Sequence, residues 1–417
     1  MKITYVHYCS ALFLTLHSMT HTYSYLPDEM SLSDTLLINA HNSPQSFAYS
    51  WRYAQQKGTL RNQWKAGARG MKINFHWRKP LSFTEHIGTL IQKKTEASKN
   101  NLLSLPEERG IREWFNKAEE KAIDAMHYVS GKFVPKENNN KPFIALGHEP
   151  DGASNCMLSA YLQKSNEVDT ALSYFTEFAK IMKENPNDIA IIIIEDYLDR
   201  RSDQNGTNNY SDETIQKELD GLIEQSGLAQ YALKLDPKYW AQGGRTAEKW
   251  PTVGELRNSN KRLILLTDRY NHAVQSPYLN PYNSETFRRS HWAYNWEADM
   301  AKTCKLLYES NATMFIITHG AEVSLQEGSI PSAVLYLLRK FGFKPATPDG
   351  AAIKGIDYKI LNNEKNIRQR IADCQKKSCL TPVSVIGLDF VEEGNVYETI
   401  KKINRERAQA FGLKLKE

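Results

Sequence analysis

The sequence lacks several patterns that would place it in a common class of protein. After the first residues, no apolar run in the 417-residue chain approaches the length of about 18 residues that a membrane-spanning helix needs. The chain has no CxxC pair and no HExxH run, so a structural zinc site has no support. Its net charge of +5 comes without a basic stripe interleaved with aromatic residues, so we expect no nucleic-acid partner. The slight positive excess fits a solvated surface and is compatible with an anionic substrate.

The N-terminus is typical of an export signal. Lys2 supplies a positive charge, Ile3–Leu16 is mostly apolar, and small and polar residues follow over Ser18–Ser24. This order predicts a signal peptide over residues 1–24 and a secreted or periplasmic protein. The alternative is a buried N-terminal strand or helix.

Cysteines are few, with five in the chain. Loss of Cys9 with a signal peptide would leave four, which permits two disulfides in an exported protein. Cys374 and Cys379 are separated by a short polar, turn-like segment and could close a small loop. Cys156 and Cys304 would be the remaining two, and four free thiols are the alternative.

The remaining chain alternates apolar runs of strand length with longer amphipathic stretches. The runs are continuous rather than alternating, as expected of parallel strands that are buried on both faces. They are Leu36–Asn39, Gly70–Phe75, Phe143–Leu146, Ile189–Ile194, Leu263–Thr267, Met314–Thr318 and Val383–Phe390. Helices are predicted over Asp169–Glu184, Thr214–Gln225 and Asn295–Glu309. This alternation indicates one α/β unit, a (β/α) barrel.

A long polar, Lys-rich segment over about 79–141 separates the second predicted strand from the third. It contains a helix candidate at Pro106–Met126. Loops that follow barrel strands often carry function, so this insertion could be a lid or a membrane contact. A surface helix without function is the alternative.

Two predicted strands end in a histidine. His41 follows the run at Leu36–Asn39, and His148 follows the run at Phe143–Leu146. Histidine titrates near neutrality and can take or give a proton. Two such residues facing one pocket could serve as general base and general acid.

The polar strand ends form a set with a recognisable order. The segments are 39–43, 63–74, 146–148, 193–197 and 385–390. In this order they resemble the X-domain superfamily of phosphatidylinositol-specific phospholipases C, and most closely its small, single-domain branch. The resemblance runs from about Leu36 to Val396. It implies a distorted TIM-like barrel over residues 25–417, with a long insertion after the second strand and its site at the carboxyl ends of the strands.

The resemblance also implies an activity, that of a phosphoric diester hydrolase. Its substrate would be an inositol phospholipid at a membrane surface, and its product a cyclic inositol phosphate. We expect a monomer. His41 matches the base, Asp389 the carboxylate that holds this base in the correct tautomer, and His148 the acid. A carboxylate that stabilises the charged imidazole makes the neutral ring a better base. Tyr294 and Trp296 could stack on the inositol ring or touch the membrane, with core packing as the alternative.

The chain departs from the family pattern where calcium would bind. Asn42 and Glu195 match calcium ligands, but Lys72 and Asn74 stand where an acidic pair is expected. Calcium needs six to eight oxygen ligands, so we predict no cofactor and disfavour calcium. The hypothesis is that Lys72 replaces the metal as a fixed cation against phosphate, with Glu195 as its charge partner and the two asparagines close by. The alternative is a salt bridge in an impaired barrel that binds a phosphorylated head group or a protein partner.

Other residues of these segments are expected to have no catalytic role. Gly67 and Arg69 match the family as turn and packing residues. Two histidines lie outside these segments. His76 is interpreted as a surface histidine, with a place at the rim of the pocket as the alternative, and His319 as structural or peripheral. A phosphodiesterase for glycerophosphodiesters or sphingolipids is a third interpretation, which the residues at positions 72 and 74 oppose because such relatives place acidic metal ligands after the second strand.

Overall fold

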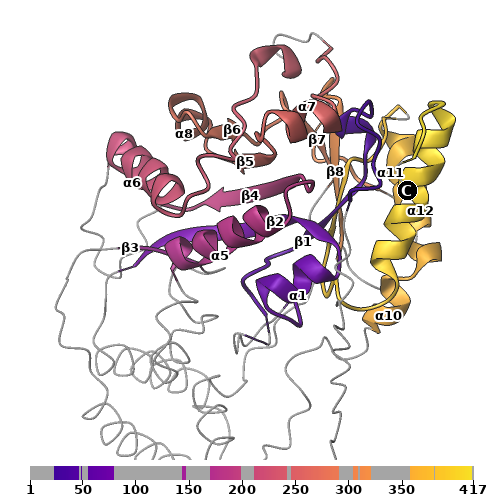
Figure 1. Cartoon of the computed structure of the whole chain (residues 1–417), viewed down its shortest axis with the longest axis horizontal. Helices are drawn as coiled ribbons and strands as arrows, with labels where there is room; N and C mark the ends of the chain where they lie inside the picture. Colours follow the sequence, from indigo (N-terminus) through magenta and orange to yellow (C-terminus); the bar gives the residue numbers. More distant parts are fainter. Residues whose placement is uncertain are drawn as a thin grey trace, which may run out of the picture.

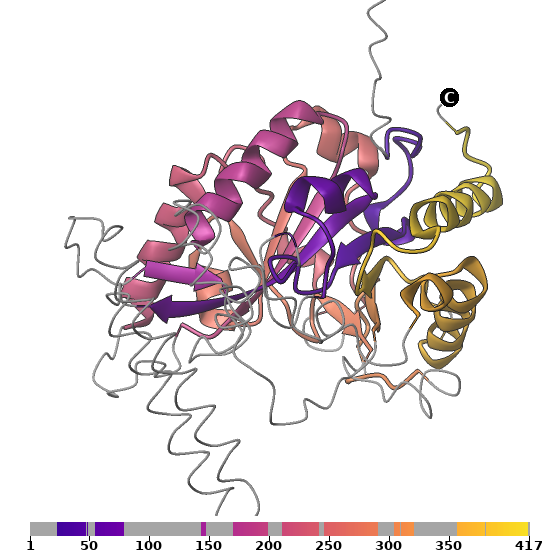
Figure 2. The same ribbon diagram turned by 90° about the horizontal axis from the view of Figure 1, so that it is seen from below.

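The computed structural model describes residues 23–46, 48, 55–78, 143–146, 170–198, 211–241, 246–290, 304–308, 310–320, 357–379 and 381–415. In this part of the chain, eight parallel strands form a curled half-barrel with helices on its outside (Figures 1 and 2). The predicted α/β barrel class is confirmed. The predicted insertion at 79–141 lies outside the described residues.

The sheet has the order β6-β5-β4-β2-β1-β9-β8-β7. Its strands are β1 (Leu37–Ala40), β2 (Ala68–Arg78), β3 (Phe143–Leu146), β4 (Ala190–Asp196), β5 (Leu263–Thr267), β6 (Leu279–Pro281), β7 (Phe287–Arg289), β8 (Met314–His319) and β9 (Val385–Leu388). All seven predicted strands are present. The third was wrongly predicted to be parallel, because β3 pairs antiparallel with the outer half of the long strand β2.

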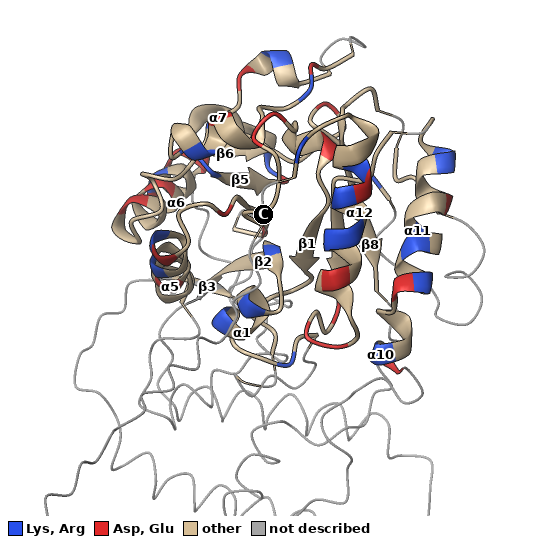
Figure 3. Cartoon of the chain, turned by 45° about the vertical axis from the view of Figure 1, so that its right-hand side comes forward, with Lys and Arg blue, Asp and Glu red and all other residues tan. Residues whose placement is uncertain are grey.

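The helices connect these strands on the outer side. They are α1 (Leu60–Lys65), α5 (Ala171–Glu184), α6 (Asp212–Gln225), α7 (Val253–Asn258), α8 (Tyr270–Gln275), α10 (Tyr358–Leu361), α11 (Glu364–Lys377) and α12 (Val396–Ala410), with 3-10 turns η1 (Leu32–Asp34) and η3 (Pro237–Tyr239). Helix α5 packs against α6, and α11 against α12. The outer surfaces of α11 and α12 carry both signs of charge (Figure 3), which is typical of a solvated face.

Helices α5 and α6 confirm the helices that were predicted over Asp169–Glu184 and Thr214–Gln225. The side chain of Thr170 accepts a hydrogen bond from the backbone of Ser173 and caps the start of α5. The helix ends at Glu184, ahead of Pro186. Phe178 on its inner side is fully buried and packs edge-on against the Trp64 ring at 5.6 Å. Truncation of such a side chain to alanine costs about 3–5 kcal/mol.

The third predicted helix, Asn295–Glu309, is not borne out over its described end. Residues 304–308 are not helical, and Leu306 forms an isolated bridge with Ser290. The apolar spacing that suggested a helix instead places Leu306 against the core, packed by the edge of β7.

The predicted pairing of Cys374 with Cys379 is wrong. Cys374 bonds to Cys304, while Cys379 is free and exposed. The reason is the direction of the side chains on α11. Cys374 lies on the buried side of the helix, facing the segment before β8, whereas Cys379 lies beyond the end of the helix. Cys156 lies outside the described residues.

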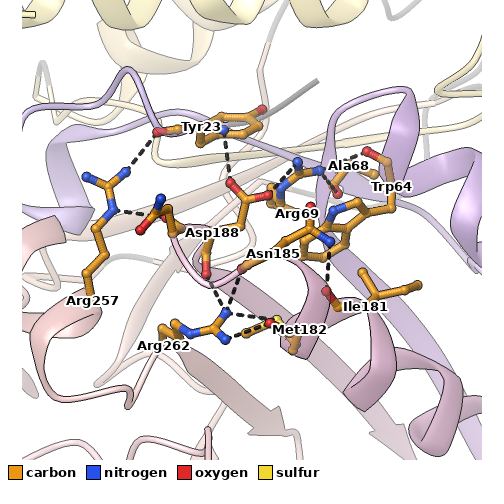
Figure 4. A network of polar contacts seen from close by, with 11 residues as sticks. Tyr23, Trp64, Ala68, Arg69, Ile181, Met182, Asn185, Asp188, Arg257 and Arg262 are labelled. Carbon is orange, nitrogen blue, oxygen red and sulfur yellow. Dashed lines mark hydrogen bonds and ion pairs between the residues drawn. The ribbon is translucent and has the colours of Figure 1, made fainter. Parts of the chain in front are cut away.

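A buried polar network lies at the amino ends of β2 and β4 (Figure 4). Arg69, at the start of β2, forms an ion pair with Asp188 at 2.8 Å. Asp188 also accepts a hydrogen bond from the backbone N–H of Tyr23 at 3.0 Å, and Arg257 donates to the carbonyl of Tyr23. Because Tyr23 is buried in this network, a mature chain that began at residue 25 would lose these contacts. Among the described residues, no helix is long and apolar enough to cross a membrane.

Candidate active site

The polar residues singled out in the sequence converge on the carboxyl end of the half-barrel. Strand β1 pairs with β2 and with β9 so that the residues just before His41, Lys72 and Asp389 are direct partners. Asn74 is the direct partner of Glu195 across β2 and β4. Because side chains alternate between the two faces of a sheet, this register turns all five toward the same side, the mouth of the half-barrel.

The first pair in this mouth joins β1 to β9. The Nδ1 atom of His41 lies 2.9 Å from a carboxylate oxygen of Asp389. The Asp389 side chain is only 3% exposed and that of His41 is 12% exposed. A carboxylate can only accept, so Nδ1 carries the proton and Nε2 of the neutral ring presents its lone pair. This is the tautomer that a general base requires.

The second pair joins β2 to β4. The ammonium of Lys72 lies 2.8 Å from one oxygen of Glu195 and 3.4 Å from Nε2 of His41. The Asn74 side chain donates to the other oxygen of Glu195 at 2.9 Å. Burial by itself would raise the pKa of Glu195, but the charge and hydrogen bond of Lys72 outweigh it and hold this pKa below its ordinary value. Glu195 is therefore an anion with both oxygens engaged.

Of the two residues that match calcium ligands in the family resemblance, Glu195 already has one oxygen bound to Lys72 and the other to Asn74. A divalent cation on Glu195 would have to share that carboxylate with the Lys72 ammonium, which repels it. The Asn42 amide nitrogen donates to Gln55, and its oxygen has no hydrogen-bond partner among the described residues. Within the same residues, no group of three or more His, Cys, Asp or Glu side chains could hold a metal ion.

A second cation borders the mouth and was not singled out from the sequence. Arg289 ends β7, and its guanidinium lies 4.0 Å from the centre of the Tyr282 ring, which follows β6. Since β6 and β7 are the two ends of the strand order, this contact brings the edges of the half-barrel together. Burial would lower the pKa of Arg289, but Tyr282, Tyr308 and Glu195 raise it above its ordinary value. Strands β6 and β7 have only three residues each. Their sequences therefore contain no apolar run that would have indicated a strand next to Tyr282 and Arg289.

Asp268 is a further residue at the same end of the sheet that the sequence did not indicate. It follows β5, and its Oδ1 accepts from the backbone N–H of Asp196 at 2.9 Å. Although the residue as a whole is exposed, desolvation of its carboxyl group raises the pKa of Asp268 to about 6, and the charges of Glu195 and Asp196 add to this against the opposing hydrogen bond.

Three of the predicted site residues lie outside the described residues: His148, Tyr294 and Trp296. Two further histidines are described. His76 is buried, with its ring stacked on Tyr197 at 5.0 Å, so its interpretation as a surface residue was wrong. His319 is also buried and contacts the carbonyl of Leu361 at 3.0 Å, and burial lowers the pKa of His319 to about 4. His319 is therefore a neutral structural residue.

A second histidine–carboxylate pair lies on the outer side of β4. Nδ1 of His272, on α8, is 2.7 Å from Asp196, and its Nε2 is 3.9 Å from Asp212 at the start of α6. Burial lowers the pKa of His272, but the hydrogen bond to Asp196 and the charges of both aspartates outweigh this and raise it. The pair joins α8 to the ends of β4 and α6 and stands apart from the mouth.

Comparisons with known proteins bear on the family and the fold. The model of the PI-PLC X family, the X domain of phosphatidylinositol-specific phospholipases C, matches residues 153–336. The family resemblance predicted from the sequence is thereby confirmed.

Solved structures with a similar fold include the phosphatidylinositol-specific phospholipase C of Listeria monocytogenes. It is 12% identical with a TM-score of 0.43, and the match covers 93% of this chain and 98% of that one. The enzyme of Staphylococcus aureus is 11% identical with a TM-score of 0.42, covering 91% of this chain and 96% of that one. No curated protein sequence matches the chain.

Proposed function

We propose that this protein is a phosphodiesterase of the phospholipase C type that cleaves an inositol phospholipid. The observation that supports this most is the pairing of His41 with Asp389 at 2.9 Å beside the ion pair of Lys72 and Glu195 at 2.8 Å. An oriented neutral imidazole next to a fixed cation is what attack of a hydroxyl on a phosphodiester requires.

The proposed reaction begins with proton transfer to Nε2 of His41 from the inositol hydroxyl next to the phosphodiester. The oxygen of that hydroxyl bonds to phosphorus, and the bond from phosphorus to the diacylglycerol oxygen breaks. The leaving oxygen takes a proton from a general acid, the role proposed for His148. The products are diacylglycerol and a cyclic inositol phosphate. Asp389 stabilises the imidazolium that forms, and such acid–base steps each contribute about 10²- to 10⁴-fold.

Lys72 is proposed to bind the phosphate while it keeps its contact with Glu195. An ammonium has three donors. A phosphate oxygen can replace Nε2 of His41 as a partner of Lys72, which at the same time frees the lone pair of the base. Asn42 and Asn74 are proposed to complete the polar surroundings of the phosphate, with Tyr294 and Trp296 against the inositol ring. No metal ion is needed in this scheme.

A second candidate is a barrel that binds a phosphorylated head group or a protein partner without turnover. The observation in its favour is the distance of 3.4 Å between the Lys72 ammonium and Nε2 of His41. In this position the Lys72 ammonium engages the lone pair of Nε2, which the base needs in order to accept a proton. The two candidates differ in whether substrate draws Lys72 away.

The proposed setting is the surface of a membrane, where a monomer exported by its apolar N-terminal segment would meet its lipid. Turnover of phosphatidylinositol in vesicles tests the proposal directly. We expect release of diacylglycerol at the same rate with excess chelator and with added calcium. A requirement for calcium would contradict the role of Lys72, and absence of turnover under both conditions would favour the binding protein.

A further inference from the structure

A buried glutamine lies between the two strands that carry the histidine–aspartate pair. Gln56 is fully buried. Its Nε2 donates to the carbonyl of His41 at 2.8 Å and to the carbonyl of Leu388 at 3.0 Å, and its Oε1 accepts from the backbone N–H of Val391 at 3.2 Å. One side chain therefore uses both of its donors and its acceptor on the backbone at the ends of β1 and β9.

These three backbone groups enclose the pair. One belongs to His41 itself, and the other two flank Asp389 on either side. The carbonyl of Leu388 also accepts from the backbone N–H of His41 at 3.0 Å, so Gln56 extends the ladder between the two strands by one more link. The link lies at the point where the two functional side chains leave the sheet.

The backbone around Asp389 is tightly constrained, so it cannot easily take up a new conformation if the hydrogen bonds of Gln56 are lost. Phe390 has a φ of 49°, a left-handed conformation that is strained for a bulky residue. Asn362 donates to the carbonyls of Asp389 and Phe390 at 2.9 and 3.1 Å. A Cβ atom on Gly320 would lie only 2.9 Å from Oδ2 of Asp389. The carboxylate is thus held in a narrow space that a backbone shift would disturb.

We infer that Gln56 is a positioning residue that fixes the distance and angle between His41 and Asp389. The kinetic part of this inference depends on the proposed function, whereas the geometric part does not. A displacement of about 1 Å in a catalytic constellation can lower a rate by about 10²-fold. A neutral amide also has no charge to gain or lose, so its three hydrogen bonds persist across the working pH range.

A structural role alone is the alternative, and the chain offers a matched control for it. Gln63 is also fully buried. Its Nε2 donates to the carbonyls of Ser43 and Gly58 at 2.9 and 3.0 Å, and its Oε1 accepts from the Ser43 hydroxyl. It has the same chemistry and lies in the same part of the fold, but none of these hydrogen bonds involves a backbone atom of His41 or Asp389.

The test compares Gln56→Met with Gln63→Met in the full chain. Turnover of phosphatidylinositol gives kcat and KM, and proton NMR follows the Nδ1 proton of His41 that is shared with Asp389. We expect Gln56→Met to lower kcat by about 10- to 100-fold with KM nearly unchanged, and to shift or broaden this proton signal. Gln63→Met should keep the signal and keep kcat within about threefold of the wild type.

Equal effects of the two variants on kcat and on the proton signal would overturn the inference. If Gln56→Met does not fold, Gln56→Asn serves instead, because it keeps the amide on a stem one methylene shorter and should lose the proton signal in the same way. If the wild type has no turnover, the proposed function fails, but the NMR comparison still decides whether Gln56 holds the pair.

Discussion

Strand β2 carries two ion pairs of opposite character, one near each end of the half-barrel. Arg69 meets Asp188 with both side chains at most 2% exposed. Lys72 meets Glu195 with the two side chains 14% and 18% exposed. One pair is sealed in the core, and the other is open to a ligand. An ion pair of the same type thus stabilises the fold at one end and is accessible to an anionic ligand at the other.

The difference follows from the cation that each site uses. The guanidinium of Arg69 is planar, and it also donates to the carbonyls of Trp64 and Ala68 at 2.9 Å and lies over the Trp64 ring. Such a fork is fixed by several partners at once. Lys72 is a point charge on a flexible stem with contacts to Glu195 and His41, so it can exchange one partner for a phosphate.

The largest effect is expected from the open end. His41→Ala removes the proposed base and should lower kcat by about 10⁴-fold, because no other group accepts the hydroxyl proton. The free energy of unfolding, measured with urea, should fall by about 1–3 kcal/mol because the buried Asp389 carboxylate loses its partner. A turnover number within tenfold of the wild type would contradict the proposed role.

At the sealed end, we expect a large effect on stability alone. Arg69→Met leaves Asp188 as a buried charge without its ion-pair partner and should lower the free energy of unfolding by about 3–5 kcal/mol. Arg61→Met, which removes exposed contacts to Glu177 and Glu184, is the control and should cost at most about 1 kcal/mol. Similar losses of unfolding free energy in the two variants would contradict the claim that burial makes the Arg69–Asp188 pair important for stability.

Lys72→Met should affect activity more than stability, the opposite of Arg69→Met. We expect kcat/KM to fall by about 10²- to 10³-fold, because the phosphate loses its nearest cation. Lys72→Arg keeps the charge and should retain part of the activity. The loss of unfolding free energy in Lys72→Met should be smaller than in Arg69→Met, because Glu195 keeps its hydrogen bond from Asn74 and is 18% exposed. A rise in turnover for Lys72→Met would mean that Lys72 blocks His41 instead of assisting it.

The smallest effect concerns the second histidine pair. The pKa of His272 is raised above its ordinary 6.5 in the folded chain. Its protonated form therefore stabilises the fold fully below that value, and this contribution is lost as pH rises through the higher folded pKa. His272→Gln should flatten the dependence of unfolding free energy on pH above the ordinary value of 6.5. Turnover should be unaffected, and an unchanged slope would contradict the assigned pairing with Asp196.

Much of the fold was predictable because buried parallel strands leave continuous apolar runs. Strand β4, with Ile191–Ile194 at most 1% exposed, is such a run. Strands β6 and β7 have three residues each and leave no run to detect, so Tyr282 and Arg289 were missed. The antiparallel pairing of β3 was missed because an apolar run carries no sign of strand direction.

The site was predictable where a polar residue follows an apolar run, as His41 and Asp389 do. The role of Gln56 left no such sign, because it acts through contacts with backbone atoms up to 335 positions away. The disulfide was misassigned for a related reason. Proximity in sequence suggested Cys374 and Cys379, whereas the direction of α11 turns Cys374 toward Cys304.

The most direct measurement is phosphorus NMR of phosphatidylinositol vesicles incubated with the wild-type protein in excess chelator, with His41→Ala in parallel. We expect the cyclic inositol phosphate signal to grow with the wild type and to be absent with the variant. Product that forms equally with both proteins, or that forms only after calcium is added, would contradict metal-free catalysis by His41 and Lys72.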